Sequence, residues 1–239
     1  MSDERGTSAR EDLLEGLSWR LPEYWMLALC GAAWIALVAR AGGRGPVHCP
    51  GVAAGWWHWM LMVVAMMLPL KIDGVRLTAE RSLWRRRNRA TAGYLGGYLG
   101  VWALAGVPLA WSFATFHLVH RIDWRVGAAV GFLIEGVWLI SPWKERAARL
   151  GHLTLPLAPS GWRADADCLA SGGLAGLGCA ANCWPLMLVC WLSGHSLVAM
   201  VFSFALGWSD RHASVDRKLL AAAMVLVGAS FAALHRLLV

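Results

Sequence analysis

The chain contains 239 residues, of which 58% are hydrophobic and only 15% are charged, and its mean hydropathy is +0.49. A soluble domain of this size carries more charge, so the composition excludes a soluble protein and predicts one that lies in a bilayer. The net charge of +7 does not predict a nucleic-acid partner, because the basic residues fall in short stretches between apolar runs.

The first part of the chain, residues 1–21, carries several acidic and basic side chains before any sustained apolar run. This pattern predicts a cytoplasmic amino-terminal segment without a cleavable signal peptide. Residues 22–239 are predicted to form a single transmembrane helical domain. A bilayer core is about 30 Å thick, so each spanning helix needs about 20 apolar residues. Apolar windows of this kind fall at residues 22–39, 55–70, 91–119, 124–141, 169–191, 194–208 and 219–238.

These windows predict an all-α fold, a polytopic integral membrane helix bundle with about seven transmembrane helices. Most of the 22 Lys and Arg residues lie in the amino-terminal segment and in every second loop after it. Under the positive-inside rule these parts are cytoplasmic, which places the amino terminus in the cytoplasm. The stretch 142–168 is expected to be a long loop with room for a short interfacial helix.

Glycines four residues apart recur in the predicted spans. The third span contains Gly93 and Gly97, and the fifth contains Gly172 and Gly176. Small residues at this spacing let two helix backbones approach closely in lipid. The fourth span has the same spacing at Gly127 and Gly131, and the sequence therefore predicts a compact single-domain bundle.

Most of the eight histidines are predicted to lie near the non-cytoplasmic side. His58 begins the second span, His117 and His120 end the third, and His195 lies in the turn after the fifth. Cys190 is predicted at the same level. Imidazole and thiol groups gathered in this way indicate a metal site, while the alternative interpretation is that these histidines are amphipathic side chains tolerated at the membrane interface.

A second group of candidate ligands is predicted deeper in the bilayer. On a helix, His58, Met62 and Met66 share one face, because they are four residues apart. Cys179 and Cys183 have the same spacing on the fifth span. Thioethers and thiolates favour Cu(I), so copper is the predicted metal, with zinc or haem as alternatives. The other interpretation is that these sulfur-containing side chains only fill the core.

An acidic side chain is predicted at a depth similar to that of the cysteine pair. Glu135 lies well inside the fourth apolar window. An ionisable group at this depth is costly, which makes it a functional candidate.

Several stretches resemble one bacterial family, catalogued as predicted metal-binding integral membrane proteins with a domain of unknown function. The resemblance covers residues 50–215, and Asn182 stands where the family pattern has a cysteine. It implies a metal-binding, multi-pass protein of the bacterial cytoplasmic (inner) membrane. The matching stretches are Trp59-x2-Met62-x2-Ala65-Met66-Met67-x-Pro69, "AGYLGGYLGVW" at 92–102, "SPWK" at 141–144, and Cys179-x3-Cys183-Trp184-x-Leu186-Met187.

The leading functional hypothesis is an integral membrane protein that binds, delivers or passes copper. Histidines would collect the ion outside, and sulfur ligands would hold it within the bundle. The expected partners are the lipid bilayer and a membrane-protein or periplasmic metal-binding partner, and no nucleic acid. The predicted metal ligands are His58, Met62, Met66, Cys179, Cys183, His117, His120 and His195.

Two other functional classes stay open on the sequence. One is a subunit of a membrane copper or haem oxidoreductase or monooxygenase, with two histidines as axial haem ligands. The other is a structural or assembly subunit of a membrane complex, in which glycine-lined helices support a partner. No arrangement of catalytic residues is evident, so the sequence does not decide whether the protein is an enzyme.

Overall fold

The computed structural model describes residues 24–41, 51–116, 123–150, 155–156, 158, 160–212 and 215–238. Within these ranges all regular elements are helical, which confirms the predicted all-α class; the predicted amino-terminal segment 1–21 lies outside them. The helices are α2 (Tyr24–Ala41), α3 (Val52–Met66), α4 (Ile72–Arg81), α5 (Arg87–Phe116), α6 (Trp124–Ile140), α7 (Pro142–Leu150), α8 (Gly161–Leu192), α9 (Leu197–His212) and α10 (Arg217–Leu238), with 3-10 turns η1 (Pro69–Lys71) and η2 (Trp84–Arg86).

Each predicted apolar window contains a helix, but the helices differ in their ability to cross a bilayer. Three of them, α5, α8 and α10, are long and apolar enough to cross a membrane. A fourth candidate is the pair α6 and α7, which is bent by 82° at a short break. Helices α2 and α3 are apolar but shorter. Three or four candidate spans are thus present in the described part, and the count of seven stays a prediction.

The second predicted window, 55–70, is not one continuous helix. Helix α3 ends at Met66, so its 15 residues extend only about 22 Å. Pro69 explains this end, because proline has no backbone N–H and its ring collides with the carbonyl group four residues earlier. After η1 the chain continues into α4, a polar helix that the sequence analysis placed in a loop.

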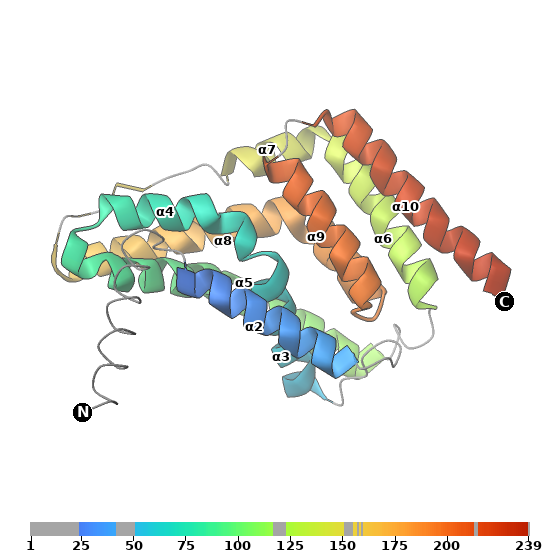
Figure 1. The fold of residues 1–239 in the computed structure, drawn as a ribbon, viewed down its shortest axis with the longest axis horizontal. Coiled ribbons are helices and arrows are strands. Elements are labelled where there is room, and N and C mark those ends of the chain that lie inside the picture. Colours follow the sequence, from blue (N-terminus) through green and yellow to red (C-terminus); the bar gives the residue numbers. More distant parts are fainter. Residues whose placement is uncertain are drawn as a thin grey trace, which may run out of the picture.

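Helix α8 joins two packed groups of helices. Its most extensive contacts are with α5, and the two run side by side along the long axis of the molecule (Figure 1). Helices α2 and α3 complete the core on this side. On the other side α6 and α10 lie against each other (Figure 1), and α9 and the last turns of α8 contribute to their core. Side chains of α8 therefore pack in both cores.

Helices α5 and α8, which carry the glycine pairs of the third and fifth predicted spans, approach each other closely. A methyl group added at Gly172 would overlap the backbone carbonyl group of Tyr94, and one added at Gly97 would overlap the carbonyl group of Leu169. The glycines therefore let α5 and α8 touch through their backbones. The register of α8 against α5 depends on this contact, and with it the position of every ligand candidate on α8.

Substitution of Gly172 by alanine is expected to destabilise the protein by about 1–3 kcal/mol, because the two backbones must separate. Thermal unfolding in detergent, followed by tryptophan fluorescence, measures the change. Gly173→Ala is the matched control, since no atom lies within 4 Å of a Cβ at that position. Equal unfolding temperatures for the two variants would contradict the backbone contact.

Candidate metal-binding core

Helix α3 presents a row of soft donors to the interior. His58, Met62 and Met66 are 1%, 0% and 0% exposed, and the two methionines belong to the core formed with α2, α5 and α8. The spacing of four residues brings the three side chains to one face, as the sequence predicted. Helix α3 therefore lines the core with one imidazole followed by two thioethers.

Helix α8 presents a second row, longer than the one predicted. Cys179 and Cys183 are both buried, and so are Met187 and Cys190 on the same face. Of these four residues, Cys179 and Cys183 were predicted as ligands and Cys190 was predicted at the level of the histidines, whereas Met187 was not predicted as a ligand. The spacing of these four residues in the sequence could have revealed the complete row, because steps of four, four and three residues follow one face of a helix.

The two rows meet at one sulfur–sulfur contact. The Cys190 Sγ lies 3.8 Å from the Met66 Sδ. The predicted meeting of sulfur groups from the second and fifth spans thus occurs, although Cys190 rather than the Cys179–Cys183 pair makes the contact. Met200 of α9, which the sequence analysis did not consider, is buried in the same core.

A pair of histidines lies where the first half of α3 meets the turn after α8. The rings of His58 and His195 are in edge-to-face contact, with centroids 4.7 Å apart. His195 lies in the turn after α8 with a φ of 59°, and its backbone N–H donates to the Cys190 carbonyl oxygen at 2.8 Å. This hydrogen bond fixes His195 next to Cys190, the last residue in the row of donors on α8. The other two predicted histidine ligands, His117 and His120, lie outside the described residues.

The histidine pair has the chemistry of a metal ligand set. Both ring nitrogens of His58 are buried without a hydrogen-bond partner among the described residues, and a buried polar group left in this way is costly. His195 is buried as well, and burial favours the neutral imidazole, which is the form that binds metals. The ring contact leaves no gap for a haem between the two, so the arrangement suits a single ion.

The Cys179–Cys183 pair lies further along α8, in contact with polar groups. The two thiols interact electrostatically with each other. The Tyr98 hydroxyl lies 3.2 Å from the Cys179 Sγ and 3.0 Å from the Met67 carbonyl oxygen. Tyr98 therefore links the cysteine pair to the break at the end of α3.

A buried ion network lies beside Cys183. The Lys144 Nζ is 3.6 Å from a Glu135 carboxylate oxygen and 3.0 Å from one of Asp210, and it also donates to the Asn182 carbonyl oxygen at 3.4 Å. Lys144 and Glu135 are 2% and 1% exposed. Glu135 was predicted at the depth of the cysteine pair, and its electrostatic interaction with Cys183 agrees with this. Its partner Lys144 was not predicted, because Lys144 enters the core only through the bend between α6 and α7.

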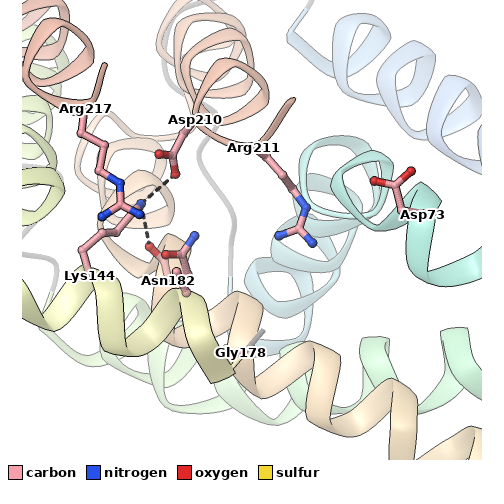
Figure 2. Close-up of a pocket in the computed structure, with 8 residues that line it drawn as sticks. Asp73, Lys144, Gly178, Asn182, Asp210, Arg211 and Arg217 are labelled. Atoms are coloured by element: carbon pink, nitrogen blue, oxygen red, sulfur yellow. Dashed lines mark hydrogen bonds and ion pairs between the residues drawn. The ribbon is translucent and has the colours of Figure 1, made fainter. Parts of the chain in front are cut away.

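A charged pocket reaches the same part of α8. It encloses about 210 Å³, and its wall includes Gly178 and Asn182, the residues directly before the two cysteines. Lys144, Asp210 and Asn182 lie together on one side of it, while Arg211 and Asp73 lie on the other (Figure 2). The pocket therefore brings polar surroundings close to an otherwise apolar cysteine pair.

The described residues contain no group of three or more His, Cys, Asp or Glu side chains that could hold a metal ion.

A family model described as PpoB2, a copper chaperone, matches residues 56–234. The matched region contains both rows of donors, the histidine pair and the buried ion network. A comparison with curated proteins found no match, and a comparison with solved structures found none.

Proposed function

The chain belongs to the family of the copper chaperone PpoB2, and we propose from this premise that it binds copper within a membrane and passes it on. Its copper would enter at the histidine pair and move to sulfur ligands inside the bundle. Soft thiolate and thioether donors select Cu(I), so the cargo is proposed to be the cuprous ion.

The surface supports the membrane part of the proposal. Apolar side chains are widely exposed along several helices, and a soluble monomer avoids such extended apolar patches. We propose a multi-pass protein of the bacterial inner membrane, with about seven spans and a cytoplasmic amino terminus. Examples of this exposure are Ile35 at 72%, Leu104 at 75%, Val137 at 66% and Leu226 at 67%.

The order of donors supports a direction along the bundle. The histidine pair, the Met66–Cys190 contact and the Cys179–Cys183 pair follow one another along α8. His117 and His120 are proposed to join the histidine pair from the end of the third span. A periplasmic or membrane-bound metal-binding partner would exchange copper at that end.

The observation that carries the proposal is His58. It is buried with two ring nitrogens that have no partner among the described residues, on the helix face that continues into Met62 and Met66. A core histidine that served only packing would be expected to hydrogen-bond. A copper ion on this imidazole would give one of the two nitrogens a partner.

Wild-type protein reconstituted in liposomes is expected to retain Cu(I) through gel filtration, measured by metal analysis. The His58→Phe variant should load Cu(I) at least about tenfold more slowly, because loss of a metal-site group costs a factor of this order or more. His212→Phe is the matched control, since His212 stacks on Trp208 at the far end of α9. Equal loading by wild type and His58→Phe would reject the histidine entry site.

A further inference from the structure

A groove of about 500 Å³ opens between α6 and α8, beside the bend into α7. Its lining residues are aliphatic or aromatic except for Ser141. Several of them are widely exposed, with Val137 at 66%, Trp143 at 61% and Trp184 at 43%. The volume lies within the range of small-molecule sites, about 300–1,000 Å³, and its walls suit an apolar ligand.

Two tryptophans give the groove a fixed wall. The Trp138 indole N–H donates to the Asn182 carbonyl oxygen at 3.2 Å. The Trp138 ring also lies edge-to-face against the Trp184 ring, with centroids 5.4 Å apart. Because a hydrogen bond and a ring contact both hold Trp138 in place, the groove is preformed for a ligand.

A basic helix lies at one end of the groove. Helix α7 follows α6 after a short break and turns away from it by 82° (Figure 1). The Arg146 guanidinium lies over the Trp143 ring, 4.7 Å from its centre, which places a cation at the edge of the apolar walls. Stacking on a ring leaves the guanidinium N–H groups, which lie in its own plane, able to bind a phosphate.

The positive charge of α7 is not neutralised by its neighbours. Glu145, the one acidic residue of this helix, lies 3.3 Å from Arg217 of α10. Lys144 is buried in the ion network and does not face the groove. Within the described part of the chain no carboxylate pairs with Arg146 or Arg149. An anion is therefore favoured at the end of the groove where α7 begins.

We propose that the groove binds one anionic phospholipid, with an acyl chain along Val137 and Trp184 and the phosphate at Arg146. The inference rests on the membrane location in the proposed function. On the predicted topology α6 ends at the cytoplasmic side, where anionic lipids give the leaflet a negative surface potential. A zwitterionic lipid fills the apolar walls equally well, but it carries its own cation beside the phosphate and gains less from Arg146.

Brominated lipids test the inference, because bromine on an acyl chain quenches only nearby tryptophans. Full-length protein is reconstituted in phosphatidylcholine vesicles that contain equal amounts of brominated phosphatidylglycerol or brominated phosphatidylcholine. The quenching lost in the Trp143→Phe and Trp184→Phe double variant reports the groove. In the wild type this component should show about fivefold preference for phosphatidylglycerol, the factor expected for one Arg at an anionic headgroup.

Arg146→Gln should abolish this preference and leave equal quenching by the two lipids. Arg163→Gln is the matched control, because Arg163 also lies over a tryptophan ring, that of Trp162 at 5.8 Å, but does not border the groove. This control should keep the preference of the wild type. A preference that persists in Arg146→Gln would overturn the inference.

The wild type alone separates this inference from the proposed function. Protein that does not float with the vesicles in a density gradient would overturn the membrane location. If the protein floats and the two lipids quench the groove tryptophans equally, the lipid site is overturned and the membrane location stands. The same holds if neither lipid quenches them, since a second copy or another protein segment then covers the groove.

Discussion

Replacement of Cys179 and Cys183 together by alanine is expected to lower the Cu(I) affinity of the protein more than about a hundredfold. Loss of even an outer-shell partner of a metal lowers its affinity by up to about that factor, and this change removes two thiolates at once. The two side chains are small and buried, so alanine leaves little empty space and the fold should persist. Copper content after purification and chelator competition both measure the loss.

Two other cysteines provide matched controls for this double substitution. Cys168 lies on α8 as well and is equally buried, but it packs against Gly93 near the start of the helix. Cys30 is buried on α2. Alanine at either site should leave Cu(I) affinity unchanged. If the Cys179 and Cys183 double variant retains the copper content of the wild type, the cysteine pair is a packing feature and the proposed sulfur path ends at Met66 and Cys190.

A further cysteine variant, Cys190→Ala, tests the contact between the two rows of donors. It removes the sulfur that contacts the Met66 Sδ and leaves both the histidine pair and the other cysteines in place. If copper passes from Cys190 to the Cys179–Cys183 pair, this change should slow the rate at which Cu(I) reaches that pair without lowering the pair's equilibrium Cu(I) affinity. An equilibrium loss as large as that of the double variant would instead make Cys190 a ligand of the same site.

Much of this arrangement could be predicted from local patterns. The spacing of four residues brings His58, Met62 and Met66 to one helix face, and the same spacing aligns Cys179 with Cys183. The glycine pairs likewise predicted close helix packing, although not which helices would meet. These features depend only on helix geometry and on residue size, which a single sequence carries in full.

The polar surroundings of the cysteines could not be predicted in the same way. Lys71 enters the core because Pro69 interrupts α3, and Lys144 enters it because the chain bends by 82° between α6 and α7. Hydropathy places both lysines in cytoplasmic loops, since it treats a break in an apolar run as the end of a span. The partners of Lys144 come from α6 and α9, and pairing across helices distant in sequence leaves no periodic signal.

The buried ion network should give the second large effect. Lys144→Met is expected to lower the free energy of unfolding by about 3–5 kcal/mol, because it leaves the carboxylates of Glu135 and Asp210 in the core without their cation. It also removes the hydrogen bond from the Lys144 Nζ to the Asn182 carbonyl oxygen, next to Cys183. Unfolding in detergent by heat or denaturant, followed by tryptophan fluorescence, measures the loss.

A second substitution separates charge from packing in this network. The Glu135→Gln and Lys144→Met double variant removes one buried carboxylate together with the lysine, so it should be more stable than Lys144→Met alone, by about 1–3 kcal/mol for groups that share one network. Copper affinity then tests whether the network belongs to the metal site. The Lys144 charge is already balanced by carboxylates, so the double variant should keep its Cu(I) affinity. A copper loss as large as that of the Cys179 and Cys183 double variant would mean that the ion network takes part in holding the metal.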